Sequence, residues 1–362
     1  MRTMMLYIDS MQKGGAQRVM ANLADHLLEL GDRVILVNDI KPIKNIPEYT
    51  MKKGVERFFL DQSESDNRFK KNVNRIINLR RVVKKQKVDC IISFEGPPNL
   101  RMLSATVGIK TKKIVSVRND PYKEYGKGLR KRIAQLFFLL ADGCVFQTRE
   151  AADFFLKSTQ KKSEIIYNPV NPKFYKADNR DPKKEIAMVG RLQPQKNYYL
   201  AIQAFSNVVK KYPDYKLVIY GDGILKIELQ NLCKHLNIDN SVIFYGVVDA
   251  VEEKLSTASI FLLSSDFEGM PNALMEAMAV GIPVISTDCP CGGPKALIES
   301  DIQGILVPCG NIDKMSEALC RLIENEGLRI KMGLEAKKRA LDFLPEIVFK
   351  AWDDYVNKVC IQ

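Results

Sequence analysis

The stretch ASIFLLSSDFEGMPNALMEAMAVGIPVISTDCPCGGP, residues 258–294, predicts a buried strand, a tight turn, a short helix and a second strand. Its apolar run 260–263 is typical of a strand that is buried on both faces. Pro271 fits the first turn of the helix; alternatively, Asn272 caps a helix that begins at Ala273. Such a turn points free backbone N–H groups and a positive dipole end at the space above the sheet.

Two carboxylates belong to this stretch. Glu268 enters the turn, and Glu276 follows on the helix. Both can face one ligand if that ligand is phosphorylated and rich in hydroxyls, because amides hold phosphate and carboxylates accept from hydroxyls. Two isolated glutamates are more often a solvated acidic pair, so the rest of the chain has to decide between the two interpretations.

Length and composition limit the possible fold, location and metal content of the protein. The chain has 362 residues, of which 46% are hydrophobic and 27% charged, which is typical of two globular α/β domains. No apolar run is long enough to span a bilayer, and the N-terminus lacks the features of a signal peptide, so we expect a cytoplasmic protein. The eight cysteines form no paired Cys-x-x-Cys knuckles and only two histidines are present, which argues against a zinc site.

Charge is divided unevenly along the chain. Residues 1–180 carry 35 Lys and Arg against 19 Asp and Glu, whereas the remainder carries 20 against 24. A strongly basic first half next to a mildly acidic second half indicates that the first half meets an anionic surface.

Strands alternate with helices in two successive runs, which predicts an α/β fold of two doubly wound parallel sheets. Ligands of such sheets bind at the carboxyl ends of the strands, so we expect a cleft between two facing domains. The predicted parts are a first domain of residues 1–175, a polar linker of 176–184, a second domain of 185–344, and a helix of 345–362 that packs back toward the first domain.

Two predicted helices in the basic half are candidates for contact with a membrane. Residues 68–87 carry nine Lys and Arg and no acid. Residues 127–140 place four cations ahead of an apolar stripe, with Phe137, Phe138 and Leu140 expected to dip into the bilayer interface. The alternative is an ordinary core helix whose first turn is solvated.

Two loops carry residues suited to phosphate. Gly14 and Gly15 follow the first strand, where adjacent glycines let backbone approach a ligand closely, but the pattern is not G-x-G-x-x-G and so disfavours a nicotinamide dehydrogenase. In the second half, Arg191 and Lys196 lie five residues apart after a strand. With the helix N-terminus of the same domain they would form a metal-free diphosphate clamp, and no Asp-x-Asp pair is present to hold a divalent ion.

At these residues the sequence resembles the retaining glycosyltransferases of family 4, which have the GT-B fold of two facing Rossmann-like domains. The resemblance covers nearly the whole chain. The run EGMPNALMEAMA is similar to enzymes that add hexoses or N-acetylhexosamines in capsule, O-antigen and lipid-linked oligosaccharide assembly. The motifs that carry the resemblance are GGAQR at 14–18, VGR at 189–191 with KN at 196–197, YGDG at 220–223, and Phe244, Gly246, Glu268 and Glu276.

The resemblance implies a role for each motif. Arg191 and Lys196 would bind the diphosphate of a UDP-sugar, Glu276 the ribose, Glu268 the sugar, and the backbone near Val247 the uracil. The family retains anomeric configuration, so stabilising the departing diphosphate would be the main catalytic task. The expected catalytic residues are Arg191, Lys196 and Glu268. The expected nucleotide-sugar site comprises Gly14, Gly15, Gly190, Arg191, Lys196, Asn197, Val247, Glu268, Gly269, Met270, Pro271, Asn272, Leu274 and Glu276.

The acceptor side departs from the family pattern. Many members carry a histidine near the end of a first-domain strand, but neither His26 nor His235 is placed for that. The resemblance implies an acceptor on polyprenyl diphosphate, such as undecaprenyl diphosphate, at the inner face of the plasma membrane, where anionic lipids would attract 68–87 and 127–140. The candidate acceptor-side residues are Glu95, Arg118, Asn119 and Asp120.

Two other functions fit part of the pattern. A nucleic-acid-binding protein would explain the basic half but not the clamp or the paired carboxylates, so we expect no nucleic-acid partner. A UDP-sugar epimerase with the same two-domain plan would explain the nucleotide site and would need no acceptor. We expect a transferase that uses a UDP-sugar and requires neither a metal nor a cofactor.

Overall fold

The computed structural model describes residues 1–361 except 13, 45, 62–66 and 180, and it divides the chain into two compact units. One unit joins the described residues of Met1–Asn168 with those of Val348–Gln362, and the other is Pro169–Ile347. The first crossing was expected near residue 175. It lies at 168–169 because Val170 N donates to Phe343 O over 2.9 Å and Tyr175 Oη donates to Ala340 O over 2.7 Å, which ties this segment to the second unit.

The first unit is built on a parallel sheet of seven strands in the order β3-β2-β1-β4-β5-β6-β7. Order reverses between β1 and β4, and such a switch point is where open α/β sheets bind ligands. The strands are β1 (Thr3–Ile8), β2 (Arg33–Asn38), β3 (Glu56–Phe59), β4 (Cys90–Phe94), β5 (Lys112–Ser116), β6 (Gly143–Phe146) and β7 (Ser163–Ile165).

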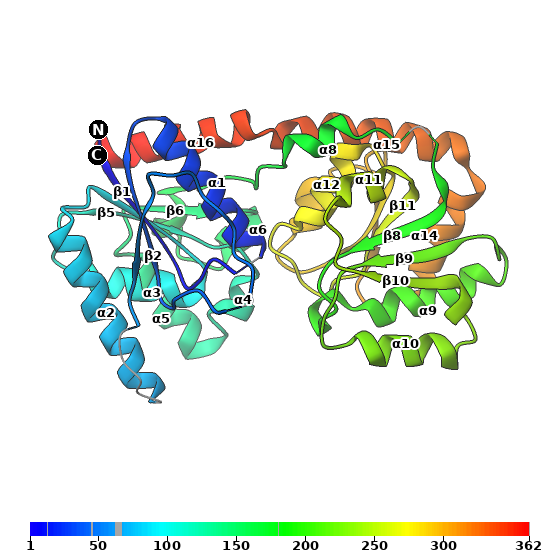
Figure 1. The fold of residues 1–362 in the computed structure, drawn as a ribbon, viewed down its shortest axis with the longest axis horizontal. Helices are drawn as coiled ribbons and strands as arrows, with labels where there is room; N and C mark the ends of the chain where they lie inside the picture. Colours follow the sequence, from blue (N-terminus) through cyan, green and yellow to red (C-terminus); the bar gives the residue numbers. More distant parts are fainter. Residues whose placement is uncertain (13, 45, 62–66, 180, 362) are drawn as a thin grey trace. The chain divides into compact units, whose positions relative to one another are not determined.

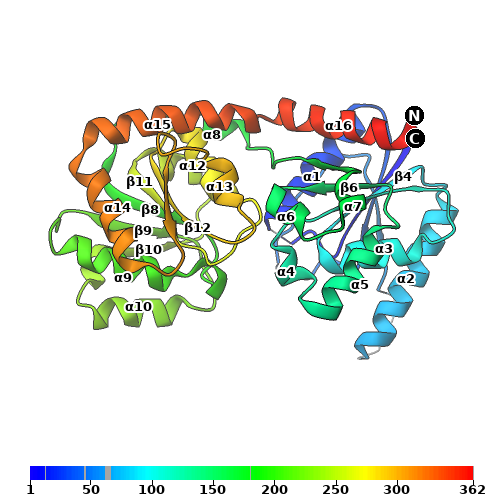
Figure 2. The same ribbon diagram turned by 180° about the vertical axis from the view of Figure 1, so that it is seen from behind.

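Helices cover both faces of this sheet. Figures 1 and 2 show α1 and α16 on one side and α2, α3 and α5 on the other. Trp352 and Tyr355 of α16 belong to the same buried core as Leu6 and Ile92 of the strands, so the C-terminal helix is part of the first unit from Val348 onward. The helices of this unit are α1 (Gly15–Glu29), α2 (Arg68–Lys85), α3 (Gly96–Ala105), α4 (Pro121–Glu124), α5 (Gly128–Phe138), α6 (Arg149–Asp153), α7 (Lys157–Gln160) and α16 (Pro345–Ile361).

The second unit is built on a parallel sheet of six strands in the order β10-β9-β8-β11-β12-β13. This is the doubly wound order, with its switch point between β8 and β11. The stretch 258–294 supplies β11, the turn, α12 and β12, which places it at the centre of this sheet. The strands are β8 (Lys183–Val189), β9 (Lys216–Tyr220), β10 (Val242–Gly246), β11 (Ala258–Leu263), β12 (Val284–Asp288) and β13 (Ile305–Pro308).

One face of the second sheet packs on α9, α10 and α14, and Figure 1 shows α8, α11, α12 and α15 on the opposite side. The helices are α8 (Pro172–Lys176), α9 (Tyr198–Val209), α10 (Lys226–His235), α11 (Val251–Ser256), α12 (Asn272–Val280), α13 (Gly293–Leu297), α14 (Ile312–Glu324) and α15 (Glu326–Ala340), with short 3-10 turns η1 (Pro194–Lys196), η2 (Asp239–Ser241) and η3 (Leu341–Phe343).

The basic helix α5 differs from its prediction in which residues it exposes. Phe138 was expected to face a membrane, but its ring is fully buried and stacks on Phe155 with centroids 4.2 Å apart. Of the other two predicted residues, Phe137 is half-buried, whereas Leu140, just beyond the helix, is exposed. The remaining exposed apolar side chains are Leu129, Ile133, Leu136 and Leu139. Among the described residues, no helix is both long and apolar enough to cross a bilayer.

Candidate functional site

The candidate site lies at the switch point of the second sheet. Residues 190–197 leave the carboxyl end of β8, and residues 264–271 leave the carboxyl end of β11, its neighbour in the sheet. The two loops bond to each other directly, because Asp266 N donates to Gln195 O over 2.9 Å and Ser264 Oγ donates to Lys196 O over 2.9 Å. Residues about seventy positions apart in the sequence therefore form one rigid surface.

Lys196 and Glu268 meet across these loops. Lys196 Nζ lies 2.5 Å from Glu268 Oε1, and Ser265 Oγ donates to the same oxygen over 2.6 Å. Gln195 Nε2 donates to Phe267 O over 2.9 Å, which fixes the turn that carries the carboxylate. Because Glu268 is buried, this ion pair and the hydroxyl stabilise its charge where solvent cannot. Lys196, predicted to bind the diphosphate, and Glu268, predicted to bind the sugar, thus form one ion pair.

Asn197 fixes the other side of the β8 loop. It adopts a left-handed conformation with φ of 41°, which asparagine tolerates better than most residues. Its Oδ1 accepts from Leu200 N over 3.1 Å and so caps α9, while its Nδ2 donates to Asp266 Oδ1 over 2.7 Å. The side chain predicted to contact the donor therefore already holds two elements together.

Arg191 differs from Lys196 in being exposed. Within the described part of the chain, its guanidinium makes no hydrogen bond or ion pair. Its backbone is fixed, since Gln193 N donates to Arg191 O over 2.8 Å. A positioned backbone with an unengaged guanidinium suits a group that binds an anionic ligand from solvent.

Glycines bring neighbouring loops into contact at this edge. Gly221 follows β9, and a Cβ on it would lie 1.9 Å from Gly190 O, so no other residue fits without moving the backbone. Gly221 N donates to Gly246 O over 2.7 Å, which draws in the end of β10. Val247, predicted to lie beside uracil, follows directly and is exposed.

The helix α12 begins at Asn272, with Pro271 as its N-cap, so neither predicted alternative for its start holds. Proline is accepted at this position because no helical hydrogen bond uses the backbone N–H there. Its carbonyl is used, since Leu274 N donates to Pro271 O over 3.1 Å. Glu276 lies one turn into the helix and is buried. A Cβ on Gly293 would lie 1.7 Å from Gly269 O, so α13 packs directly beneath the turn.

Burial and Glu268 together raise the pKa of Tyr198, whose phenol is therefore neutral over the physiological range. Tyr198 Oη donates to Gly190 O over 3.0 Å. A neutral tyrosine thus holds the glycine that begins the β8 loop, and the charge on Glu268 strengthens this arrangement.

In the first unit, Gly14 and Gly15 form the start of α1, with Gly14 as its N-cap. The four acceptor-side candidates lie at the carboxyl ends of β4 and β5. Asp120 is the N-cap of α4 and accepts from Tyr122 N over 2.8 Å, so its carboxylate has a structural task. Arg118 is buried and donates to Asn168 Oδ1 over 3.0 Å.

The sequence-based prediction missed Gln195 and Ser265 as partners of Glu268 and its turn, and Asp266 as the partner of Asn197. Ser265 lies three positions before Glu268, a spacing at which hydroxyls often bond within a turn, so this contact had a local signal. The contacts of Gln195 and Asp266 cross between β8 and β11, and nothing local marks them.

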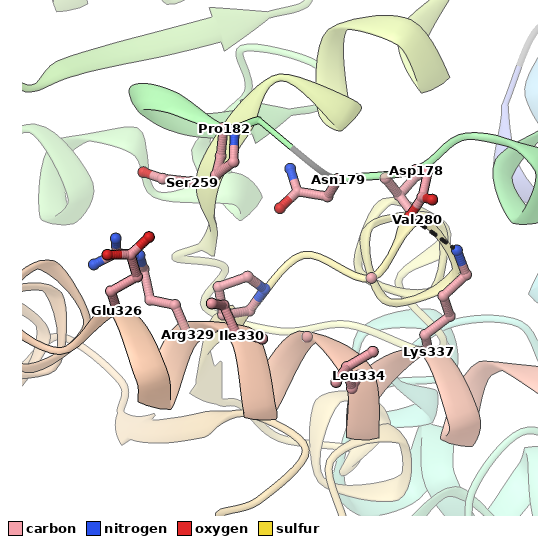
Figure 3. A pocket seen from close by; sticks show the side chains of 13 residues that line it. Asp178, Asn179, Pro182, Ser259, Val280, Glu326, Arg329, Ile330, Leu334 and Lys337 are labelled. Carbon is pink, nitrogen blue, oxygen red and sulfur yellow. Dashed lines mark ion pairs between the residues drawn. The ribbon is translucent and has the colours of Figure 1, made fainter.

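A separate hollow of about 150 Å³ lies at the opposite edge of the second sheet, near the amino ends of β8, β11 and β12 (Figure 3). Ile330 and Leu334 of α15 line it, and the ion pair of Lys337 and Asp178, 3.6 Å apart, closes one side. None of the predicted site residues contributes to it. Ligands of parallel sheets bind at the carboxyl ends of strands, so this hollow is not the donor site.

Two family models match the chain. The model described as Glycosyltransferase Family 4 matches residues 13–174, and the model described as Glycosyl transferases group 1 matches residues 171–339. Together they span residues 13–339, which includes parts of both units and every residue of the candidate site.

Among similar proteins is the N-acetylgalactosamine-N,N'-diacetylbacillosaminyl-diphospho-undecaprenol 4-alpha-N-acetylgalactosaminyltransferase of Campylobacter jejuni. It is 30% identical over 95% of this chain and 96% of its own length. An uncharacterized glycosyltransferase of Methanocaldococcus jannaschii is also 30% identical, over 78% of this chain and 82% of that protein. The crystal structure of Anabaena HepE with UDP and glucose superposes with a TM-score of 0.81 at 16% identity, covering 99% of this chain and 100% of that one, and so shares the fold.

Proposed function

The chain belongs to the family 4 glycosyltransferases, and from this membership we propose that it transfers a hexose or N-acetylhexosamine from a UDP-sugar to a saccharide, with retention of anomeric configuration. The enzyme class, glycosyltransferase, follows from the family, and the fold is GT-B. The donor, the stereochemistry and the acceptor are our proposal. For the acceptor we propose a saccharide on a polyprenyl diphosphate, because the name of the Campylobacter jejuni relative describes such a substrate.

The observation that carries the proposal is the constellation at the second switch point, where Arg191 is exposed on the loop that holds Lys196 against Glu268. Lysine has three N–H donors, so Lys196 can keep Glu268 and still donate to a phosphate oxygen. Arg191 can bind the same diphosphate through two parallel N–H groups. In our mechanism these cations stabilise the negative charge that grows on the departing diphosphate.

In this mechanism the two carboxylates accept hydrogen bonds from hydroxyl groups of the sugar-nucleotide. One oxygen of Glu268 accepts from Lys196 and Ser265. The other accepts from Gln195 Nε2 over a long distance of 3.4 Å, and a sugar hydroxyl can replace this weak contact. Glu276 is one turn along α12 and would accept from the ribose. The N-terminus of α12, at Gly269–Asn272, would add backbone donors to the phosphate.

We propose that the clamp works without a divalent metal. Two cationic side chains would supply the charge that Mg²⁺ supplies in many phosphoryl sites. Treatment of the protein with EDTA is therefore expected to leave transfer largely intact. Complete loss of activity that Mn²⁺ restores would contradict this part of the proposal.

We further propose that the first unit binds the cytoplasmic surface of a membrane through α2 and α5. On α2, Phe69, Val73 and Ile77 form an exposed apolar stripe on a helix that carries no acid. On α5, Leu129 and Leu136 are exposed behind a cationic first turn. Apolar side chains flanked by Lys and Arg suit an anionic bilayer interface, where a lipid-linked acceptor would lie.

A panel of UDP-sugars incubated with the purified protein tests the proposed donor. The proposal predicts that one UDP-sugar is hydrolysed slowly without acceptor, is transferred faster with a lipid-linked saccharide, and yields a product of the same anomeric configuration by NMR. Conversion of a UDP-sugar to its epimer without acceptor would favour the epimerase. Inversion at the anomeric carbon would contradict the proposed retaining mechanism.

A further inference from the structure

A buried arginine at the carboxyl edge of the first sheet has donors that the protein does not use. Arg118 follows β5 and is only 8% exposed. Its guanidinium carbon lies 4.0 Å from the ring centroid of Phe94 and 5.4 Å from that of Trp352. Because aromatic rings flank the guanidinium, hydrogen bonds are left to the edges of its plane.

One edge of that plane has no partner. Arg118 Nη1 donates to Asn168 Oδ1 over 3.0 Å, but Nε and Nη2 make no hydrogen bond to any residue that the structure describes. These two atoms carry parallel N–H groups on the same side of the guanidinium, which is the fork that binds two oxygens at once. A buried cation with unsatisfied donors is energetically unfavourable, so a ligand whose oxygens accept from both N–H groups is strongly stabilised.

A second buried polar group lies near enough to Arg118 for its charge to act on the pKa of the guanidinium. Glu124, the last residue of α4, has its Oε2 atom shielded from solvent and without a hydrogen-bond partner in the described chain. A Cβ on Gly96 would lie 3.2 Å from Glu124 Cβ, so this carboxyl packs against the start of α3. Burial raises the pKa of Glu124 to about 8, helped by Glu95 and Asp120 and opposed by Arg118. Burial also lowers the pKa of Arg118 to about 9.

The backbone at this place is strained. Glu95 joins β4 to α3 with φ of 72°, a conformation that non-glycine residues rarely adopt and that clusters at binding sites. β4 lies at the switch point of the first sheet and β5 is its neighbour. Arg118 and Glu124 therefore lie where this sheet is expected to bind a ligand.

We propose that Arg118 and Glu124 form the subsite that binds a sugar ring of the acceptor, with the free guanidinium edge donating to the hydroxyl oxygens on two adjacent ring carbons and Glu124 Oε2 bonding a further hydroxyl. This inference rests on the proposed function for the identity of the acceptor. N–H donors on Arg118 together with a carboxyl oxygen on Glu124 suit a diol, whose hydroxyls both give and receive hydrogen bonds. A phosphate suits the place less well, because the acids Glu95 and Glu124 lie close enough to Arg118 to act on its charge.

The test uses the full chain and two variants, each with a purpose. Arg118→Lys keeps the charge and removes the fork, and Glu124→Met keeps the side-chain length and removes both oxygens. Arg101→Lys is the matched control, since Arg101 is also 8% exposed in the same unit but donates to Tyr7 Oη over 2.9 Å and pairs with Asp39. Each site variant is expected to raise the acceptor KM at least tenfold, while the UDP Kd and acceptor-independent UDP-sugar hydrolysis stay within twofold.

A parallel rise in the UDP Kd, or an unchanged acceptor KM in both site variants, would overturn the assignment and leave Arg118 a structural residue. A second arm does not depend on catalysis. Saturation-transfer NMR with methyl α-N-acetylgalactosaminide is expected to give a signal with wild-type protein and Arg101→Lys and to lose it with Arg118→Lys and Glu124→Met. That pattern would support the sugar site even if no UDP-sugar were turned over. Displacement of the glycoside signal by millimolar inorganic phosphate would instead assign the fork to an oxyanion.

Discussion

The carboxyl edges of the two sheets differ in whether their buried charged groups have partners. In the second unit, Lys196 and Glu268 are 2.5 Å apart, and the buried carboxylate takes a further bond from Ser265. In the first unit, the buried Arg118 has one hydrogen bond, and its Nε and Nη2 atoms have no partner among the residues that the structure describes. The unengaged cation of the second unit, Arg191, is by contrast exposed, where water solvates it at little cost.

This difference indicates how each unit meets its ligand. The second unit has its charged groups positioned before a nucleotide binds, so little reorganisation is needed when charge develops on the diphosphate. The first unit has buried N–H donors on Arg118 without a partner among the described residues, which costs free energy until a ligand binds there. On our proposal, the first arrangement suits a donor whose bond must break, and the second suits recognition of an acceptor.

The largest effect is expected for the exposed cation of the second edge. Arg191→Ala should lower kcat by roughly 10²–10³, as does removal of a donor that stabilises transition-state charge. Because Arg191 is exposed, the melting temperature should change little. Steady-state kinetics with calorimetric melting checks both. Arg191→Lys, which keeps the charge, should restore part of the rate; full activity of Arg191→Ala would remove this residue from the mechanism.

A smaller effect is expected for the helix carboxylate. Glu276→Gln should weaken UDP binding by roughly tenfold to a hundredfold, because the ribose hydroxyl then donates to a neutral amide oxygen in place of a carboxylate. Titration calorimetry with UDP and with inorganic diphosphate measures this. The diphosphate affinity should stay unchanged, and an equal loss for both ligands would show that Glu276 acts on the phosphates instead.

The two units should also differ in their response to lipid. Replacing Leu129 and Leu136 together by Ser should lower binding to anionic vesicles by about tenfold, since exposed apolar side chains supply the insertion energy. They are 73% and 61% exposed, and Ile224 and Ile227 of the second unit, 80% and 74% exposed, provide the matched control pair. Flotation should show no loss for the control pair. Equal losses in both double variants would mean that the attraction is not specific to α5.

The smallest effect concerns stability and pH. The pKa of Glu124 is about 8 in the folded chain against an ordinary value of 4.5 when the chain is unfolded, so between these values the folded state holds a proton that the unfolded state has released. Glu124 therefore costs increasing stability as pH rises from 4.5 to 8. Glu124→Gln should raise the melting temperature by a few degrees at about pH 8 and leave it unchanged near about pH 4. A gain that is independent of pH would contradict this origin.

Much of the fold could be predicted from the sequence. The stretch 258–294 was predicted as strand, turn, helix and strand, and β11, α12 and β12 are observed there, because buried apolar runs leave few alternatives. The helix α3 was missed because Gly96-Pro97-Pro98 is typical of a break, although prolines are accepted in a first turn. The short edge strand β3 was also missed, since its four residues carry little pattern.

The site was predictable only as separate loops. Sequence placed Lys196 and Glu268 at strand ends, but their ion pair depends on β8 and β11 being neighbours in the sheet, which no local pattern specifies. The burial of Arg118 between Phe94 and Trp352 was equally hidden, because it depends on the C-terminal helix packing on a strand more than two hundred residues away in sequence. Long-range packing, rather than residue type, decides which charges are engaged.

The most direct test of the account is a crystal structure of this protein with UDP. We predict that the diphosphate contacts the Arg191 guanidinium and the Lys196 ammonium, and that the ribose hydroxyls donate to Glu276. A nucleotide bound at the Arg118 edge of the first sheet, or in the hollow beside α15, would contradict it.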